Sequence, residues 1–543
     1  MLYKPYKICN FAARKENKES FHPGLSMKSS RIVIFLFSVM LGLGILCVVF
    51  PKDGLQIGSI RLEFPDLAYA LDAKTEEVTD TLSEELELED SMETAESVEQ
   101  FKGLTDAQEV EFMINSSKSP TRIYLPNDSI EYLDDFFAAL DEAKDQRVRI
   151  MHFGDSQLEG DRMTCYLRQA FQEAYGGIGL GLIPAVQTVS SVTLTEDLQG
   201  DAMRYLAYGP KSEQAEHHRY GPLCQMAEID GEASLEFTCM GGKKFSHGGH
   251  FTQVTVLASG TGSLELFVGN DSIGDIREIE SETMQMLNFP AGGYKGRLAI
   301  TGHVEIYGLM LDGGRGVQMD NIGLRGSSGT LFTSIDRSTL TPFFSRENVR
   351  LIILQFGGNA VPYMDEQSDI NGYVSGMRSQ IRMFKRLAPQ SCILFIGPSD
   401  MATQVGEEMV TYPILPNLIS SLRKMCGEEG VAFWNMFAAQ GGAGSMVRWC
   451  ELGLAGEDYV HFSPSGARRI SKLFFESLQK YYQFYRLRMG LDNMEEPSDS
   501  TENATGKDSV RKADEKIRSA HRDSIKVTMT RRDTTKTGKE MLP

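Results

Sequence analysis

The chain has 543 residues, of which 41% are hydrophobic, and its formal net charge is -19. A chain of this length can bury a large core and is long enough for more than one domain. The acidic balance argues against nucleic acid as a partner, because phosphate backbones attract basic surfaces. Much of the excess negative charge is concentrated in one segment. Glu and Asp crowd residues 75–112, and we predict a solvated acidic linker over residues 51–119.

An uncharged apolar run covers residues 32–50, close to the roughly 20 residues that span a bilayer. The preceding segment, 1–31, is basic, and a basic flank stays in the cytoplasm. We therefore expect a single helix in the inner membrane, with everything after Pro51 outside the cytoplasm, in the periplasm. A cleaved signal peptide is the alternative, since Ala68-Tyr69-Ala70 has the small-x-small pattern. At the other end of the chain, the polar composition of residues 493–543 predicts a disordered tail.

Residues 120–186 have the pattern of the first part of an α/β domain. Helical periodicity over 130–140 precedes an apolar strand from 147 to 153, which ends at Gly154. Ser156 follows, and a helix is expected from Gln157 onward. Strand, tight turn and helix place Ser156 at the carboxyl edge of the sheet, beside the N–H groups of a helix N-terminus.

Residues 187–316 have a different texture. Short segments that alternate apolar and polar residues are separated by turns rich in Gly and Asp. This pattern predicts an inserted all-β, sandwich-like domain. His247 and His250 lie within it, but glycines separate them and no third ligand is evident, so we interpret this stretch as a polar loop.

The α/β pattern returns over residues 317–492. Buried strands are predicted at 349–356, 392–396 and 431–436, and helices at about 370–387, 415–426 and 464–488. Strands that alternate with helices predict a doubly wound, mainly parallel sheet.

Four separated positions fall where these predicted strands end. An acyl-transfer site needs a nucleophile, a base, a carboxylate that orients the base, and donors for the oxyanion. Ser156, His461 and Asp458 can fill the first three roles. The backbone N–H groups of Ser156 and Gly326 and the side-chain amide of Asn359 can supply the oxyanion hole.

Two blocks carry a family resemblance. The first is Gly154-Asp155-Ser156-x4-Asp161-x2-Thr164, and the second joins Gly441-Gly442-Ala443-Gly444 to Asp458-x2-His461. Over residues 147–185 and about 317–485 the chain resembles the SGNH (GDSL-type) hydrolases. More closely, it is similar to the branch of periplasmic peptidoglycan O-acetylesterases, which carry a β-sandwich between the serine and glycine blocks.

The chain departs from the family pattern at two positions. Gln157 stands where Leu is familiar, and Ala360 stands where Asp is common after Asn359. The glycine donor can be Gly326 or Gly323. Asp155 is interpreted as structural, because Asp458 is better placed to orient the histidine.

The resemblance implies a serine esterase that removes O-acetyl groups from peptidoglycan or another polysaccharide through an acyl-enzyme, with no metal and no organic cofactor. An O-acetyltransferase with the same Ser-His-Asp site is one alternative, and a non-catalytic glycan-binding protein is another. We expect the β-insert to hold the polymer, with a purely supporting role as its alternative. The pairing of cysteines cannot be deduced from their spacing.

Overall fold

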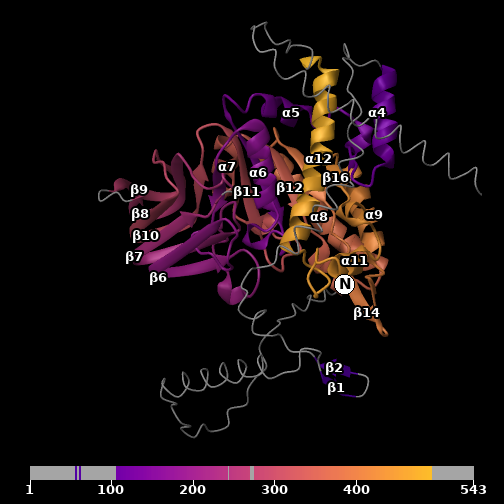
Figure 1. Ribbon diagram of the computed structural model, residues 1–543. Coiled ribbons are helices and arrows are strands. Elements are labelled where there is room, and N and C mark those ends of the chain that lie inside the picture. Colours follow the sequence, from indigo (N-terminus) through magenta and orange to yellow (C-terminus); the bar gives the residue numbers. More distant parts are fainter. Residues whose placement is uncertain (1–54, 58–59, 63–105, 243, 270–273, 492–543) are drawn as a thin grey trace, which may run out of the picture. The chain divides into compact units, whose positions relative to one another are not determined.

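The computed structural model describes residues 55–57, 60–62, 106–242, 244–269 and 274–491 (Figure 1). The predicted cytoplasmic segment 1–31, the predicted anchor 32–50 and the predicted tail 493–543 lie outside these residues, as does most of the predicted linker. Within the described ranges, no helix has the length and hydropathy of a membrane span. The chain divides into a unit over 1–97, which contains the hairpin of β1 (Leu55–Ile57) and β2 (Ile60–Leu62), and a unit over 98–543.

The end of the predicted linker is a helix, α4 (Asp106–Lys118). Its Phe112 stacks on Phe484 of the last helix, with ring centroids 3.9 Å apart, and meets Tyr481 edge to face. The linker prediction is therefore wrong for this stretch. Two aromatic contacts with the last helix thus pack this helix on the α/β part, although the composition of the segment is that of a solvated chain.

The first sheet of this unit has six strands in the order β11-β4-β12-β13-β16-β3. All neighbours pair in parallel except β3, which is antiparallel to β16. The strands are β3 (Ile123–Tyr124), β4 (Arg147–Gly154), β11 (Gly316–Gly323), β12 (Val349–Gln355), β13 (Cys392–Ile396) and β16 (Ala432–Trp434). The predicted α/β fold with a mainly parallel sheet is confirmed.

Helices cover both faces of this sheet. One face packs against α5 (Asp134–Asp141), α6 (Thr164–Tyr175) and α12 (Pro464–Arg488), and the other packs against α7 (Thr341–Arg346), α8 (Gln367–Leu387) and α9 (Leu415–Glu428). Strand β4 shows why: Val148 and Ile150 enter the first core, whereas Met151 and Phe153 enter the second. Side chains alternate across a strand, so a strand covered on both faces carries apolar residues at odd and even positions alike.

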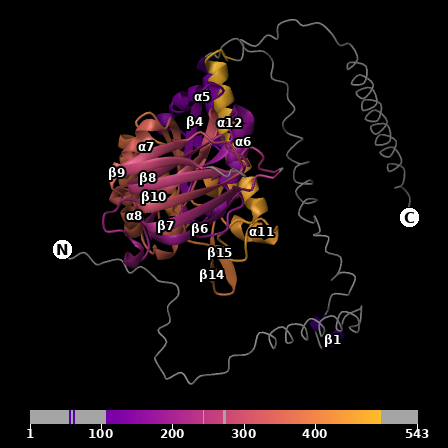
Figure 2. The ribbon, with the colours of Figure 1, turned by 90° about the vertical axis from the view of Figure 1, so that its left-hand side faces the viewer.

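The insert forms one antiparallel sheet in the order β6-β7-β10-β8-β9, with β5 pairing β10 (Figure 2). Its strands are β5 (Gly179–Ile183), β6 (Leu194–Leu206), β7 (Gln225–Cys239), β8 (Gln253–Val268), β9 (Asp275–Phe289) and β10 (Lys295–Asp312). The pairings join these strands into a single sheet, which differs from the two facing sheets of the predicted sandwich. The glycine-rich segment after α6, placed at sequence level with the α/β part, supplies β5.

Glycines inside the strands explain why the sequence suggested more and shorter strands than the insert contains. Gly302 of β10 pairs with Gly231 of β7 and with Gly262 of β8, and both Gly302 and Gly231 have positive φ. A Cβ on Gly302 would lie 2.4 Å from the carbonyl oxygen of Thr261. In the sequence such glycines resemble turns, so segments such as 253–257 and 263–268 look like separate strands. In the fold they are halves of one long strand, β8, whose register with β9 shifts between Ala258 and Gly260.

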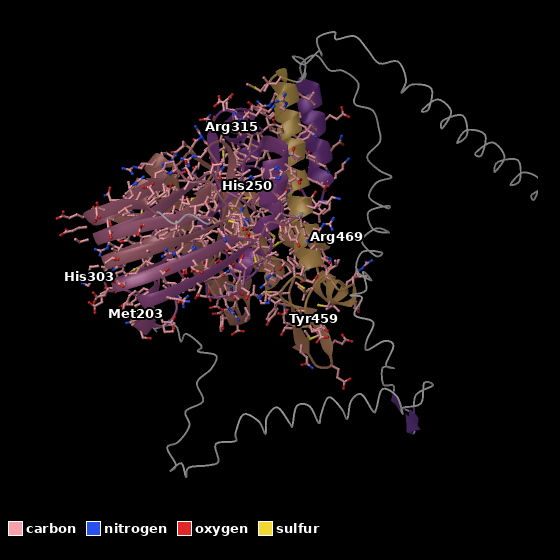
Figure 3. The ribbon with its side chains drawn as sticks, turned by 60° about the vertical axis from the view of Figure 1, so that its left-hand side comes forward. Met203, His250, His303, Arg315, Tyr459 and Arg469 are labelled. Carbon is pink, nitrogen blue, oxygen red and sulfur yellow. The ribbon has the colours of Figure 1, made fainter. Side chains whose placement is uncertain are left out.

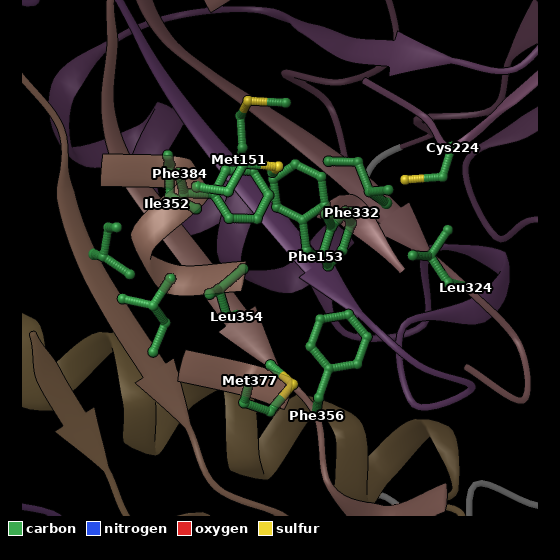
Figure 4. Close-up of a cluster of buried hydrophobic side chains, with 14 of the residues drawn as sticks. Met151, Phe153, Cys224, Leu324, Phe332, Ile352, Leu354, Phe356, Met377 and Phe384 are labelled. Atoms are coloured by element: carbon green, nitrogen blue, oxygen red, sulfur yellow. The ribbon is translucent and has the colours of Figure 1, made fainter. Parts of the chain in front are cut away.

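One face of the insert shares a core with the α/β part. Tyr220, Leu257 and Met310 of the insert belong to the same buried cluster as Phe153 and Phe384. Figure 4 shows Cys224 of the insert in this cluster together with side chains of β4 and β12. The insert is thus packed into the molecule along one face of its sheet.

A buried ionic cluster lies at the base of β4. The guanidinium of Arg149 contacts Asp312 at the end of β10, Asp320 of β11 at 2.6 Å, and Glu347 at 3.0 Å. Burial raises the pKa of Asp320 to about 6, with Arg149 acting in the opposite direction. Removing either partner of such a pair leaves an uncompensated buried charge, so the cluster fixes the last strand of the insert against the parallel sheet.

Candidate active site

The serine lies in a tight turn at the carboxyl end of β4. Gly154 ends the strand, and a Cβ there would lie 2.7 Å from the Leu158 side chain, which explains the glycine. The N–H of Leu158 donates to the carbonyl of Asp155 at 3.1 Å, which closes the turn that presents Ser156.

The helix expected from Gln157 begins later, at Thr164. A short 3-10 turn, Glu159–Asp161, intervenes, with positive φ at Gly160 and at Asp161. The carboxylate of Asp161 pairs with Arg168 of α6 at 2.6 Å. Ser156 therefore does not cap an α-helix, and any oxyanion donor near it is the N–H of a turn.

A chain of hydrogen bonds links three of the predicted residues. Ser156 Oγ lies 2.7 Å from His461 Nε2, and His461 Nδ1 lies 2.7 Å from Asp458 Oδ2. A carboxylate only accepts, so Nδ1 carries a proton and donates it to Asp458, which leaves Nε2 free to accept from the serine hydroxyl. This is the order in which a nucleophile, a general base and an orienting carboxylate must stand.

The loop between α11 (Ser445–Glu451) and α12 aims the histidine. Asp458 Oδ1 accepts the backbone N–H groups of Val460 and His461, both at 3.0 Å, and Tyr459 between them has positive φ. Burial raises the pKa of Asp458, but its hydrogen bonds from His461 and Val460 together outweigh burial, and the net pKa is lowered. Asp458 thus stays ionised while it orients the imidazole. Figure 3 places Tyr459 near the hairpin of β14 (Ala402–Val405) and β15 (Glu408–Thr411).

Two predicted oxyanion donors lie on neighbouring loops. Asn359 is in the 3-10 segment Gly358–Tyr363 after β12, and its Nδ2 donates to the carbonyl of Ser327 at 3.2 Å. Gly326 precedes Ser327 and has positive φ with open space where a Cβ would be. Gly323 instead lies within β11, where a Cβ would lie 3.0 Å from the backbone of Leu158 and Glu159. Gly326 thus lies in the loop that contacts Asn359, whereas Gly323 lies within the strand.

A cavity of about 190 Å³ opens over these residues. It is bounded by the serine turn, by the ends of β12 and β13, and by the histidine loop. Tyr363, whose side chain is 68% exposed, lies at this cavity. The other lining residues include Ser156, Phe356, Asn359, Pro362, Met401, Met436 and His461. The cavity thus combines a nucleophile with apolar walls, as small-molecule sites do.

Asp155 is separate from the catalytic hydrogen bonds. Its Oδ1 accepts the N–H of Gln157 at 3.0 Å. Burial raises the pKa of Asp155 to about 6, although that hydrogen bond and the nearby His461 act in the opposite direction. The structural interpretation of Asp155 agrees with this position, because Asp458 makes the contact with the imidazole.

Gln157 is a site residue whose contacts the sequence did not predict. Its side chain is buried and bonds to the backbone on both sides of His461, to Val460 at 2.7 Å and to Phe462 at 3.3 Å. The departure from the familiar Leu was the only sequence signal, and it does not identify a partner about 300 residues away.

His247 lies in a loop of the insert that contacts α6. His247 contacts Gln169 of α6 at 3.1 Å, and across the described ranges no group of three or more His, Cys, Asp or Glu side chains is placed to hold a metal ion. The six cysteines of the described part of the chain are all free thiols, and five of them are buried.

No protein-family model and no curated protein matches this chain. A solved structure of a peptidoglycan O-acetylesterase matches with a TM-score of 0.55 at 19% identity, covering 68% of this chain and 98% of that one. A family two carbohydrate esterase from Cellvibrio japonicus matches at 9% identity with a TM-score of 0.23, covering 54% of this chain and 99% of that one. An acetylxylan esterase, Axe2, from Geobacillus stearothermophilus matches at 16% identity with a TM-score of 0.23, covering 31% and 73%.

The first of these likenesses extends over nearly the whole of the solved chain, and it confirms the predicted resemblance at the level of fold. The chain thus shares the fold of that solved peptidoglycan O-acetylesterase. Within this fold, Ser156, His461 and Asp458 form a hydrogen-bonded chain with the geometry of a nucleophile, a base and an orienting carboxylate.

Proposed function

We propose that this protein is a membrane-anchored, extracytoplasmic serine esterase that removes O-acetyl groups from a cell-envelope polysaccharide. The observation that carries the proposal is the unbroken chain from Ser156 Oγ through His461 to Asp458, with both hydrogen bonds at 2.7 Å. The likeness in fold to a peptidoglycan O-acetylesterase supports an acetyl ester as the substrate.

The reaction has two steps. In the first, Ser156 Oγ attacks the acetyl carbonyl carbon while His461 Nε2 takes its proton, and an oxyanion forms. The N–H groups of Ser156 and Gly326 and the amide of Asn359 are the donors that we assign to that oxyanion. The tetrahedral intermediate then collapses. His461 returns the proton to the departing sugar oxygen, and Ser156 keeps the acetyl group.

The second step repeats this chemistry with water. His461 takes a proton from a water molecule, whose oxygen attacks the acetyl carbonyl, and the returned proton restores the serine hydroxyl as acetate leaves. Throughout, Asp458 holds the imidazole in the tautomer that leaves Nε2 free. If a sugar hydroxyl reached the acyl-enzyme in place of water, the same steps would transfer the acetyl group.

Acetate release tests the proposal directly. The full chain and its Ser156→Ala variant are incubated with O-acetylated peptidoglycan and with acetylated xylan, and free acetate and newly acetylated acceptor are measured together. We expect acetate from at least one polymer and a loss of several orders of magnitude in the variant. Acetate release by folded Ser156→Ala at the wild-type rate would refute the serine mechanism. If the wild-type chain forms acetylated acceptor and no free acetate, the reaction is acetyl transfer and the proposed hydrolysis is wrong.

The apolar run and its basic flank support the location outside the cytoplasm. A reporter fused after residue 119 should be active only on the outer side of the inner membrane. Activity in the cytoplasm would contradict both this location and an envelope substrate.

A further inference from the structure

Gln157 connects the serine turn to the histidine loop through a pair of hydrogen bonds. Its Nε2 donates to the carbonyl of Val460 at 2.7 Å, and its Oε1 accepts the N–H of Phe462 at 3.3 Å. These two residues flank His461, so the side-chain amide of Gln157 binds the backbone on both sides of the proposed base. The Gln157 side chain is 6% exposed, and its bond to Phe462 is buried, whereas its bond to Val460 is partly buried. Burial strengthens a hydrogen bond because little water competes for its donor and acceptor.

The backbone position of Gln157 is itself held. Its N–H donates to Asp155 Oδ1 at 3.0 Å, and it directly follows Ser156. Ser156, the proposed nucleophile, and Gln157, which binds the backbone beside His461, are thus neighbours in one turn. Any shift of the histidine loop relative to the serine must lengthen at least one of the two bonds from Gln157.

Other contacts hold the histidine loop from its own side of the site. The N–H of Gly456 donates to the carbonyl of His461 at 2.8 Å, and the N–H of Ala402 donates to the carbonyl of Tyr459 at 3.1 Å. These bonds set the shape of the loop. Neither bond connects the histidine loop to the serine turn. The distance from Ser156 Oγ to His461 Nε2 depends on such a connection.

We propose that Gln157 is a positioning residue that fixes the distance and angle between Ser156 and His461 by binding the backbone on both sides of the histidine. Only a side chain that donates and accepts at once can make both bonds, and among side chains of this length the amide of Gln does so at all pH values. A Leu of similar size would fill the space and make neither bond. This inference rests on the proposed function, since the alignment it describes serves proton transfer.

Two variants separate alignment from packing. Gln157→Leu keeps most of the volume and loses both bonds, whereas Gln157→Glu keeps the shape, can accept from Phe462 and, when ionised, cannot donate to Val460. Gln214→Leu is the matched control. Gln214 is half-buried in a loop of the insert and makes one side-chain bond to the backbone of Gly209 at 2.9 Å.

We expect Gln157→Leu to lower kcat on p-nitrophenyl acetate about 10- to 100-fold with little change in KM, since a small misplacement of the base has that effect. In Gln157→Glu we expect a lower kcat and an acidic limb of the kcat/KM profile that moves to higher pH, because a carboxylate beside the site favours the protonated imidazole. Gln214→Leu should leave kcat and the profile unchanged.

The proposal is overturned if folded Gln157→Leu retains kcat within about twofold of wild type, or if Gln157→Leu and Gln214→Leu change kcat equally. Should Gln157→Leu fail to fold, an unchanged kcat and pH profile in Gln157→Glu overturns it. A proton NMR readout is independent of turnover: the downfield resonance of the His461 Nδ1 proton should be sharp in the wild-type chain and broadened in Gln157→Glu. If the wild-type chain hydrolyses no ester, the proposed function fails, and this resonance still decides the role of Gln157.

Discussion

The Ser156–His461–Asp458 chain assembles residues that are far apart in the sequence, and its members were predictable because each follows the end of a recognisable strand or precedes a recognisable helix. Local patterns explain why the sequence singles these residues out. A strand end, a tight turn and a helix start are each indicated by neighbouring residues in the sequence. Gln157 was not predictable, because its contacts with Val460 and Phe462 depend on how two distant loops meet.

Asn359 offers a test of the oxyanion hole. In Asn359→Ala the side-chain amide is lost, while the serine, histidine and aspartate remain. We expect kcat to fall by about 10²–10³, with a smaller change in KM, because the donor acts chiefly on the charge that develops in the transition state. Steady-state kinetics on p-nitrophenyl acetate measure both constants. An unchanged kcat would remove Asn359 from the oxyanion hole.

Asp155 predicts a dependence of stability on pH. Burial raises its pKa from 3.8 to about 6 in the folded chain, so the protonated form favours folding. This contribution is fully present below the unfolded pKa and is lost as the pH rises through the folded pKa. Asp155→Asn cannot titrate and can still accept from Gln157. The unfolding free energy of wild type relative to this variant should fall by roughly 3 kcal/mol between about pH 3.5 and pH 7.

Chemical denaturation at several pH values, on both proteins in parallel, measures this difference. A difference that stays constant across the range would show that Asp155 does not titrate with a raised pKa in the folded state.

At the scale of elements, the α/β part was predicted more closely than the insert. Strand β13 and helix α12 have the bounds expected from sequence, because a strand buried on both faces and a long amphipathic helix have strong patterns. The insert was divided into too many strands, since glycines inside long strands such as β8 resemble turns. The start of α6 was placed too early, because the positive φ of Asp161 has no clear signal in the sequence.

Gly466 in the first turn of α12 tests the packing of that helix against the histidine loop. A Cβ there would lie 1.9 Å from the carbonyl oxygen of Leu454, and backbone cannot move aside as a side chain can. We expect Gly466→Ala to lower the unfolding free energy by about 1–3 kcal/mol. Gly427→Ala in α9 is the control, because nothing lies within 4 Å of its Cβ, and helix propensity should raise stability by about 0.5–1 kcal/mol. Thermal and chemical denaturation give both values, and a neutral Gly466→Ala would contradict the predicted clash.

At the scale of the whole molecule, the insert shares a buried core with the α/β part. Tyr220, Leu257 and Met310 share a buried cluster with the α/β part, and Asp312 pairs with the buried Arg149. Replacing residues 190–312 by a Gly/Ser linker would expose that apolar surface and leave Arg149 without one of its carboxylates. We expect this variant to lose its native circular dichroism and its turnover of small and polymeric esters alike. A folded remainder that hydrolyses p-nitrophenyl acetate at the wild-type rate would show that the shared core is dispensable.

The central claim is that Ser156 becomes acetylated during turnover, and mass spectrometry of the trapped enzyme tests it most directly. The full chain is mixed with p-nitrophenyl acetate, quenched in acid before a full turnover cycle ends, digested, and the peptide that contains Ser156 is weighed. The account predicts one added acetyl group on Ser156 in the wild-type chain and none in Ser156→Ala, which should also release no acetate. Ester turnover by the wild-type chain with no acetyl group at Ser156 under any quench time, together with turnover by Ser156→Ala, would contradict it.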